Sequence, residues 1–517
     1  MTSTPDARPA SGEPAVRQKK LVLLVSVVAI AVCGLIYELL SATLSSYLFG
    51  DSVFHFSVVI GLFLSAMGVG AFVSKRIEGD LLSTFVWVEI GVGTVGGFSG
   101  LLLFAAFTYQ WNFWVVLVLN CLVVGGLVGL EIPLILRLLK QVDPLRVTVG
   151  NVLGFDYIGS LLASVLFPAI LVPQLGLMRT SFLFGLINVS VAALALFLFR
   201  RELRDRSRLT AAVALAALVL LGGVISGGRL VRLLEDDLYQ DTIILSRQTL
   251  YQRIVITRFR SDYRLYLNGN LQFSTVDEHR YHESLVQPAL SAARTPRQVL
   301  ILGGGDGMAL REVLRQTSVE RVDLVDIDPQ MVRLFASHPV LKRLNSGSFA
   351  DRRVRVHHLD AMKFVERTST RYDVILIDLP DPRTLSLGKL YSASVLRLLR
   401  TRLAPGGALT LQATSPVFSR RSFWCIVNTM RYAGWQVRPY HVNVPSFSEW
   451  GFVLATRVPV QIERLRLRHS GRFLTDAVLP TLFVFPPDIG PVSTEINRLD
   501  NQILVQYFNR DSRQWNR

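Results

Sequence analysis

The sequence predicts an α-helical, multi-span membrane domain followed by a doubly wound α/β domain. Half of the 517 residues are hydrophobic, and the long apolar stretches all lie before about residue 230. After that point, short apolar strands alternate with helical segments. This alternation is typical of a parallel sheet with helices on both faces.

Seven apolar stretches make up the first half of the chain, and most reach the ~20 residues that a helix needs to cross a bilayer. They run over about 21–43, 53–74, 82–108, 112–136, 150–176, 180–199 and 210–227. We therefore expect a disordered tail at residues 1–20 and a multi-pass domain of about seven helices at residues 21–230, with the lipid bilayer as partner.

The net charge of +16 is explained by basic residues beside these stretches, such as Arg137, Lys140 and Arg200. Positive charges concentrate next to membrane spans on the cytoplasmic side. Basic residues do not alternate with aromatic ones in any patch, so we expect no nucleic-acid partner. The three cysteines stand apart without metal-ligand spacing, so we expect neither disulfides nor a metal site.

The second half, residues 231–517, is predicted to open with β structure. Tyr251–Thr257 alternates polar and apolar residues, and Asn268-Gly269 between apolar flanks predicts a tight hairpin. A helix is expected over Asp277–Leu290. Strands and helices then alternate over Gln298–Leu302, Met308–Gln316, Arg321–Asp326, Pro329–Ala336, Val354–Leu359, Ala361–Glu366 and Tyr372–Ile377, before a turn into a further strand at Leu403–Leu409.

A glycine turn follows the first strand of this alternating region. Gly303, Gly304 and Gly305 stand between a strand and a helix, where backbone can approach a ligand closely. Asp326 follows about twenty residues later at the next strand end, the position of an acid that binds ribose hydroxyls. Together they predict a nucleoside site. Asp360 and Ala361 end the third strand and either contact the base or form a helix N-cap.

The acidic residues at these strand ends predict a cationic substrate. Asp306 lies directly beside the glycine turn, where it would repel a pyrophosphate or an amino-acid carboxylate. Asp378 and Asp381 form an Asp-x-x-Asp-Pro motif at the fourth strand end. Two carboxylates can bind one ammonium group and accept a proton from it, although an Asx-type turn before Pro382 would place the same residues there.

The second half resembles the spermidine/spermine synthases, which are polyamine aminopropyltransferases, from about Tyr251 to Ala455. The resemblance implies a Rossmann-like domain of the class I methyltransferase type with an N-terminal β-hairpin region. It also implies transfer of the aminopropyl group of decarboxylated S-adenosylmethionine to putrescine. The motifs that carry it are Tyr251-Gln252, Leu267–Gln272, Asp277–Glu283, Gly303–Gly307, Asp360-Ala361 and Asp378–Pro382.

The resemblance also implies a role for each matching residue. Asp378 matches the proton acceptor. His282, Asp306, Asp381 and Gln272 match contacts to the polyamine or to the aminopropyl group. The nucleoside site is matched by Gln252, Gly303, Gly305, Asp326, Asp360 and Ala361. No cofactor is expected beyond the decarboxylated co-substrate, because a sulfonium is already a good leaving group, and the family often forms homodimers.

The chain departs from the family pattern at three places. Met308 stands where soluble members usually have a further glycine, and Asp326 stands where many have Glu. Arg383-Thr384-Leu385 replaces a stretch that often contains Gly-Pro. An arginine beside a diamine site is unexpected and leaves the length of the acceptor open among putrescine, cadaverine and spermidine.

Two further readings of the sequence remain. An S-adenosylmethionine-dependent N-methyltransferase on the same fold is disfavoured by Asp306, and a polyamine transporter or sensor with a binding-only soluble domain is disfavoured by the intact acids.

Acidic residues also fall within the apolar stretches, where ionisable groups are costly and usually face a partner or a pathway. They are Glu38, Glu89, Glu131 and Asp156. A polyamine pathway and inter-helix hydrogen bonding both account for them.

The orientation of the second half follows from the number of spans. Arg17, Lys19 and Lys20 place the N-terminus inside the cell. Seven crossings would then put the second half outside, although its nucleoside substrate is made in the cytoplasm. Either one stretch does not cross, and Thr210–Gly227 is the shortest, or the second half faces outward; we expect the first, with the second half facing the cytoplasm at the cell membrane.

Overall fold

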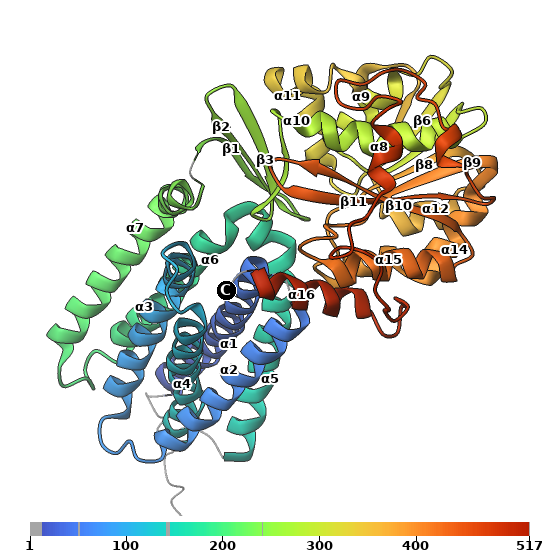
Figure 1. The fold of residues 1–517 in the computed structure, drawn as a ribbon. Helices are drawn as coiled ribbons and strands as arrows, with labels where there is room; N and C mark the ends of the chain where they lie inside the picture. The colour runs from blue at the N-terminus through green and yellow to red at the C-terminus, as the bar shows by residue number, and fades with distance from the viewer. Residues whose placement is uncertain (1–12, 50–51, 141–144, 240, 516–517) are drawn as a thin grey trace, which may run out of the picture. The chain divides into compact units, whose positions relative to one another are not determined.

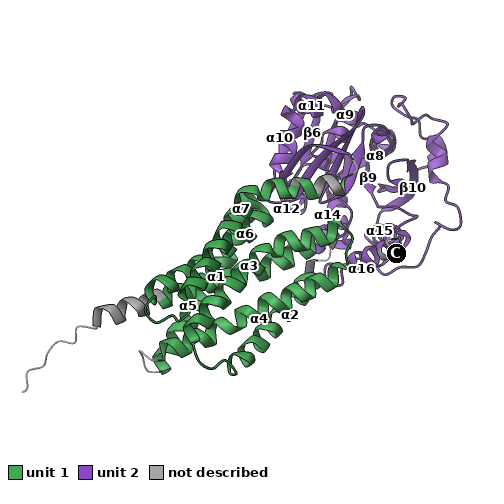
Figure 2. Ribbon diagram, turned by 90° about the vertical axis from the view of Figure 1, so that its left-hand side faces the viewer, with its two compact units in different colours: residues 1–240 green, residues 241–517 purple. Residues whose placement is uncertain are grey.

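The computed structural model describes residues 13–49, 52–140, 145–239 and 241–515 and divides the chain into two compact units, residues 1–240 and 241–517 (Figure 2). The division lies ten residues beyond the boundary expected from the sequence. Residues 1–12 of the expected tail lie outside the described residues, whereas residues 13–20 already belong to the first helix.

Unit 1 is a bundle of long apolar helices. They are α1 (Glu13–Phe49), α2 (Ser52–Ser74), α3 (Leu81–Thr108), α4 (Phe113–Leu139), α5 (Leu145–Leu166), a π-helical segment η1 (Phe167–Leu175), α6 (Gly176–Leu198) and α7 (Arg206–Leu238). Helix α1 is central, because it packs against α2, α3, α4, α5 and α6.

Glycines allow the closest helix crossings in unit 1. A Cβ atom on Gly93 would lie 2.7 Å from the carbonyl oxygen of Gly185 on α6. Gly125 on α4 lies against α2 in the same way, 2.9 Å from the carbonyl oxygen of Phe63. Small residues at such crossings are typical of helices packed in a membrane, where close backbone contact replaces the hydrophobic effect.

By length and composition, six helical runs of the described residues could cross a membrane. Arg206–Val231, which contains the Thr210–Gly227 stretch expected not to cross, is one of these six, so that expectation stays a prediction. The fifth run, Arg146–Leu198, has 53 residues and joins two of the stretches distinguished in the sequence. Its regular helix is interrupted at Gly176, where φ is 75° and ψ is 168°.

Unit 2 is a Rossmann-like α/β unit preceded by an antiparallel four-stranded sheet. The small sheet has the order β1 (Thr242–Gln248), β2 (Arg253–Phe259), β3 (Asp262–Leu267), β4 (Asn270–Ser274). The hairpin predicted at Asn268-Gly269 joins β3 to β4, with φ values of 50° and 77°. Both residues need a positive φ in such a two-residue turn, which explains the Asn-Gly pair.

The larger sheet has seven strands in the order β10-β11-β9-β8-β5-β6-β7. The strands are β5 (Gln298–Gly303), β6 (Arg321–Val325), β7 (Val354–His357), β8 (Tyr372–Asp378), β9 (Leu403–Gln412), β10 (Gln436–Val444) and β11 (Ser448–Thr456). Five of them are parallel, as predicted. The sheet as a whole is mixed, because β10 and β11 form an antiparallel hairpin on β9.

Helices cover both faces of the larger sheet. Figure 1 shows α8, α9 and α10 on one side and α12, α14 and α15 on the other. Alternate residues of β5 explain this, because Val299 and Ile301 belong to one buried cluster and Leu300 and Leu302 to another. The helices are α8 (Glu278–Ala292), α9 (Met308–Leu314), α10 (Pro329–Ser337), α11 (Pro339–Leu344), α12 (Ala361–Arg367), α13 (Leu385–Gly388), α14 (Ala393–Arg402), α15 (Arg420–Tyr432) and α16 (Ile503–Trp515), with 3₁₀ turns at Ser348–Ala350, Lys389–Tyr391, Ile462–Arg464 and Leu479–Phe483.

Candidate active site

The candidate site lies where the strand order reverses. The chain passes from β5 outward to β6 and β7 and then returns to β8 on the other side of β5. Ligands bind at such a switch point, beyond the carboxyl ends of the strands. Gly303 at the end of β5 is paired with Asp378 at the end of β8. The sheet register therefore joins the glycine turn to the Asp-x-x-Asp motif.

The glycine turn wraps closely around Asp378. Gly303 and Gly304 have φ values of 86° and 67°, a region that side chains rarely adopt. A Cβ atom on Gly303 would collide with the carbonyl oxygen of Asp378, and the amide of Gly304 donates to that oxygen at 3.2 Å. On Gly305, a Cβ atom would lie 2.5 Å from the Asp326 carboxylate. The glycine turn therefore lies directly against the backbone of Asp378 and the carboxylate of Asp326.

Asp378 is partly buried and carries a perturbed carboxyl group. Loss of water and the nearby charge of Asp306 raise the pKa of Asp378 to about 6, although His282 and the Tyr281 hydroxyl act in the opposite direction. Tyr281 donates to Oδ1 of Asp378 at 2.7 Å. A carboxyl group with a pKa in this range can both take up and release a proton near neutral pH.

His282 and Glu278 form a buried pair beneath these acids. Nδ1 of His282 lies 2.7 Å from the Glu278 carboxylate, which also binds Arg311 at 2.9 Å. Burial acts to lower the pKa of His282, but the hydrogen bond and charge of Glu278, followed by Asp306 and Asp378, outweigh it and raise the pKa to about 9. Burial likewise opposes ionisation of Glu278, yet His282 and Arg311 hold its pKa at about 2. A positive charge on His282 therefore faces the acids of the site.

Asp306 is buried in the turn, where one oxygen accepts from the amide of Met308 at 2.8 Å. Burial raises its pKa, which His282 partly offsets.

Asp381 is 16% exposed, and its Oδ1 atom has no hydrogen-bond partner among the described residues. Burial raises the pKa of Asp381, and the guanidinium of Arg383, at 3.9 Å, lowers it. The unpaired oxygen can accept a hydrogen bond from a ligand.

Gln272, which was predicted for the amine end, and the nearby motif residue Glu283 both make structural contacts. Gln272 lies on β4, and its amide donates to the carbonyl oxygens of Asn270 and Leu271 at 3.1 and 3.4 Å within its own hairpin. Glu283, the last residue of the Asp277–Glu283 motif, accepts hydrogen bonds from the backbone amides of Arg472, Phe473 and Leu474 at 2.6, 2.9 and 2.8 Å. Glu283 therefore fixes the C-terminal segment to α8.

The predicted nucleoside residues gather at the ends of β5 and β6. Asp326 accepts from the amide of Asp328 at 2.8 Å, and burial raises the pKa of Asp326 to about 6. Asp328 is buried and accepts from the side chains of Thr249 and Gln252 at 2.8 and 3.1 Å. Gln252, from the small sheet, is thus attached to the strand end that carries Asp326.

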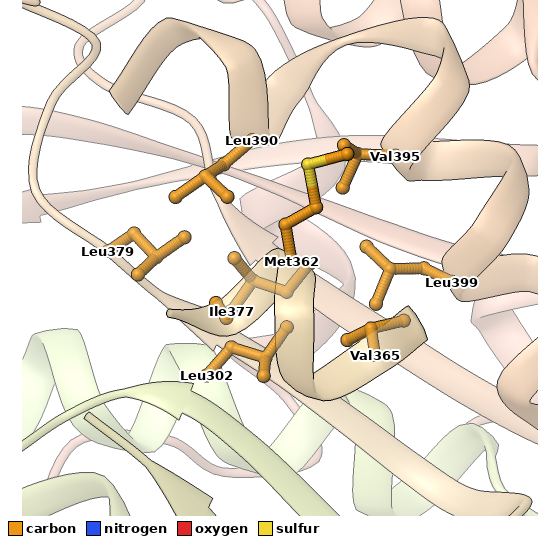
Figure 3. A pocket seen from close by; sticks show the side chains of 9 residues that line it. Leu302, Met362, Val365, Ile377, Leu379, Leu390, Val395 and Leu399 are labelled. Atoms are coloured by element: carbon orange, nitrogen blue, oxygen red, sulfur yellow. The ribbon is translucent and has the colours of Figure 1, made fainter. Parts of the chain in front are cut away.

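Asp360 is the N-cap of α12. Its carboxylate accepts from the amide of Lys363 at 3.1 Å and pairs with Lys389 at 3.1 Å. Ala361 lines a small apolar pocket together with Leu302, Ile377 and Leu379, three residues from the ends of β5 and β8 (Figure 3). The N-cap interpretation of Asp360 is therefore confirmed, and Ala361 beside it lines this apolar pocket.

Sequence reasoning missed several residues of the site. Tyr281 adjoins the predicted His282 but was not assigned, although it contacts Asp378 across 97 positions in the chain. Its ring lies 6.0 Å from Phe447 and 6.5 Å from Trp450, whose indole nitrogen has no hydrogen-bond partner among the described residues. Asp328 was visible as the second acid of Val325–Asp328, but nothing in the sequence connects it to Gln252.

The site as a whole has two chemically different ends. Acidic groups and aromatic rings surround Asp378, and such an environment suits an alkylammonium ion. Asp326 and the pocket beside Ala361 suit the ribose and base of a nucleoside. A substrate that joins a nucleoside to a positively charged centre would span both ends, with Asp378 beside the positive centre.

Comparison with known proteins agrees with this geometry. Residues 278–461 match the family model of the spermine/spermidine synthase domain. The chain is 46% identical to a polyamine aminopropyltransferase of Leptospira interrogans, over 96% of this chain and 99% of the relative. It is 45% identical to polyamine aminopropyltransferase 1 of Ralstonia nicotianae, over 99% and 98% of the two chains.

Solved structures resemble part of the chain. A crystal structure of spermidine synthase in complex with the transition-state analogue AdoDATO is 25% identical, with a TM-score of 0.45, and covers 47% of this chain and 86% of its own. Spermidine synthase from Thermotoga maritima is 24% identical, with a TM-score of 0.44, and covers 47% and 85%.

Proposed function

Because the chain belongs to the spermine/spermidine synthase family and is a polyamine aminopropyltransferase, we propose that it makes spermidine. The donor is decarboxylated S-adenosylmethionine, the acceptor is putrescine, and Asp378 accepts the proton. The observation that carries this proposal is the position of Asp378. Its carboxyl group has a pKa of about 6 and lies at the switch point, beside the turn that separates the two ends of the site.

The reaction needs one proton transfer and one substitution. An alkylammonium has no lone pair, so Asp378 first takes a proton from the acceptor nitrogen. The free amine then attacks the methylene carbon next to the sulfonium sulfur. A nitrogen–carbon bond forms and the carbon–sulfur bond breaks. Its electron pair goes to sulfur, which leaves as the neutral thioether of methylthioadenosine. The residues around Asp378 hold nitrogen, carbon and sulfur in line, which lowers the entropic part of the barrier.

Asp306 selects the decarboxylated donor. Its side chain is buried beside the glycine turn, near the place where the aminopropyl chain enters from the nucleoside end. An amino-acid carboxylate there would face Asp306 and Asp378 in a poorly solvated site, and like charges at such a distance repel strongly. This repulsion disfavours an N-methyltransferase that uses intact S-adenosylmethionine.

Asp381 and three aromatic side chains hold the acceptor amine. The unpaired Oδ1 atom of Asp381 accepts from an ammonium group. Tyr281, Phe447 and Trp450 cover the methylene chain of the diamine.

At the nucleoside end of the site, Asp326 binds the ribose hydroxyls, Gln252 is held by Asp328, and the base lies over Ala361. Gln272 can contact the amine only if its side-chain amide gives up its hydrogen bonds to the carbonyl oxygens of Asn270 and Leu271. A homodimer and a reaction without metal or bound cofactor stay predictions.

The first unit anchors the enzyme in the cell membrane, with the catalytic unit facing the cytoplasm. The six apolar helical runs support the anchoring. Facing the cytoplasm requires an even number of crossings after a cytoplasmic N-terminus. The decisive run is Arg146–Leu198, since 53 helical residues would extend about 80 Å if straight, against about 30 Å of hydrocarbon.

Product analysis tests the proposed reaction. The purified full-length chain is incubated with decarboxylated S-adenosylmethionine and, in turn, putrescine, cadaverine and spermidine. We expect methylthioadenosine and spermidine, with putrescine the best acceptor. Intact S-adenosylmethionine serves as the matched donor. Formation of S-adenosylhomocysteine from it, or no methylthioadenosine with any amine, would contradict the proposal and favour the methyltransferase or the binding-only alternative.

A further inference from the structure

The centre of unit 1 contains polar side chains that no step of the proposed reaction uses. Helix α1 packs against α2 to α6, so its middle is the most enclosed part of the unit, drawn green in Figure 2. Tyr37, in the second half of α1, is fully buried. Two acidic residues and an asparagine from neighbouring helices are fully buried as well: Glu89 on α3, Glu131 on α4 and Asn188 on α6.

A neighbouring layer of polar side chains in unit 1, formed by Ser41, Ser99 and Asn120, is hydrogen-bonded and has a structural role. One turn along α1 from Tyr37, Ser41 accepts from the amide of Asn120 on α4 at 3.3 Å. The carbonyl of the same Asn120 accepts from Ser99 on α3 at 2.8 Å. Three helices are thus joined by hydrogen bonds without a charged group. The chain can evidently pair buried polar side chains at this depth.

The layer around Tyr37 lacks such pairing. Among the described residues, no N–H or O–H donor pairs with the oxygens of Glu89 and Glu131, and the hydroxyl of Tyr37 has no hydrogen-bond partner, so each carboxyl group has only the other as a partner. The two carboxyl groups lie close enough to interact with each other and with Tyr37. Two carboxylates at this distance repel unless a proton or another cation lies between them.

Asn188 belongs to the same layer. Its Cβ atom lies 3.2 Å from the position that a Cβ on Gly93 would take, one turn along α3 from Glu89. Both polar atoms of its amide are without a hydrogen-bond partner in the part of the chain that the structure describes. The glycine at position 96 lets the ring of Tyr37 press against α3, since a Cβ there would lie 2.6 Å from the ring. Four helices therefore converge on one unsatisfied cluster.

The chemistry of this cluster determines which ligand would suit it. A buried polar group without a partner destabilises the fold, and a charged group does so more strongly. Most of the atoms in the cluster are oxygens that accept hydrogen bonds, so a ligand that supplies N–H donors and positive charge would satisfy them. Glu38 and Asp156, the other acids of the apolar stretches, are only partly buried. They do not share this requirement.

We propose that Glu89 and Glu131, together with Tyr37 and Asn188, form a binding site for a primary alkylammonium ion inside the helical bundle. An ammonium group offers three N–H donors and one positive charge to the acceptor oxygens, and the Tyr37 ring offers a cation–π surface. The choice of an ammonium over another monovalent cation rests on the proposed function, because the acceptor and the product of unit 2 are both alkylammonium ions.

Equilibrium binding of radiolabelled putrescine to the full-length chain in detergent tests the site. The experiment uses the Asp378→Asn/Asp381→Asn background, in which the catalytic site is weakened. We expect one putrescine per chain that survives an excess of NaCl or KCl. Adding Glu89→Gln and Glu131→Gln should abolish this binding, whereas the exposed Glu78→Gln should leave it intact. Tyr37→Phe, which keeps the ring, should weaken it several-fold.

Three results would overturn the inference. The first is equal putrescine binding with and without the Glu89→Gln/Glu131→Gln pair. The second is displacement of putrescine by sodium or potassium at equal concentration. The third is no putrescine binding by the Asp378→Asn/Asp381→Asn variant, which would mean that the two carboxyl groups share only a proton. If the double variant does not elute as folded protein, unchanged binding by Tyr37→Phe overturns the inference instead. Methylthioadenosine release by Glu89→Gln/Glu131→Gln alone should equal that of the wild type, so failure here is separate from failure of the proposed reaction.

Discussion

The hydroxyl of Tyr281 on α8 donates a hydrogen bond of 2.7 Å to the carboxylate of Asp378 at the end of β8. It stabilises the ionised form of Asp378, against the burial and the Asp306 charge that favour the protonated form. The pKa of about 6 is therefore a balance among named neighbours, and changing one neighbour should change the pH at which the enzyme works.

Replacing Tyr281 by Phe should shift the acidic limb of the kcat/KM profile. In the wild type the limb should lie near pH 6, since Asp378 must be ionised to take a proton. Without the hydroxyl the pKa of Asp378 rises, and a bond worth about 1.5–3 kcal/mol corresponds to a shift of about 1–2 pH units. Activity lost at pH 7 should return near pH 9. The exposed Tyr432→Phe is the control, and a uniform loss at every pH would contradict the assignment.

His282 should stabilise the fold below about pH 9. Its pKa is raised from its ordinary value to about 9 in the folded protein, so the stabilisation is fully present below pH 6.5 and is lost as the pH rises through about 9. A shift of this size corresponds to roughly 3 kcal/mol. The Tm difference between wild type and His282→Gln should be largest near pH 6 and shrink towards pH 10. The exposed His358→Gln is the control, and a difference for His282→Gln that is independent of pH would exclude a buried charged pair with Glu278.

Asp328 should act on nucleoside binding and not on the transfer step. Asp328→Asn keeps the cap of α10 but loses the charge that holds Thr249 and Gln252. We expect the Kd for methylthioadenosine to rise about tenfold, or about 1.4 kcal/mol, with kcat at saturation nearly unchanged. Calorimetric titration and steady-state kinetics measure the two quantities. Asp500→Asn, on an exposed loop, should change neither, and a fall in kcat with unchanged Kd would refute the role.

The topology should be visible with reporters at the C-terminus. A cytoplasmic catalytic unit predicts a fluorescent protein fusion that is bright and an alkaline phosphatase fusion that is inactive. A second fusion pair at Gly176 shows whether the run Arg146–Leu198 crosses once or turns back at this interruption. An active phosphatase at the C-terminus would place the catalytic unit outside and would require an external source of the nucleoside.

The sequence predicted the strands and the acids at their ends because both depend on local pattern. Apolar runs, a glycine turn and Asn268-Gly269 each carry a physical requirement that can be read without the fold. The contact of Tyr281 with Asp378 could not be read in this way, since it depends on how α8 lies across β8. Asp328 was hidden for the same reason, as its partners Thr249 and Gln252 come from the other sheet.

The antiparallel hairpin of β10 and β11 was missed for a different reason. Their residues alternate only weakly, and Pro439 in β10 is unusual for a strand. It is tolerated because β10 is the edge of the sheet, where one side needs no hydrogen bonds. In unit 1, apolar length predicted the helices, but it could not show that only Glu89 and Glu131 among the four acids are fully enclosed.

The proton-accepting role of Asp378 is tested most directly by a single-turnover measurement on Asp378→Asn. The variant is loaded with decarboxylated S-adenosylmethionine and mixed with putrescine, and the Kd for the nucleoside is measured on the same preparation. We expect the rate of methylthioadenosine formation to fall about 10²–10⁴-fold, while the Kd stays within about twofold of the wild type. Glu366→Gln, an exposed change on α12, is the control. An equal loss of transfer and of nucleoside binding, or transfer at the wild-type rate, would contradict the account.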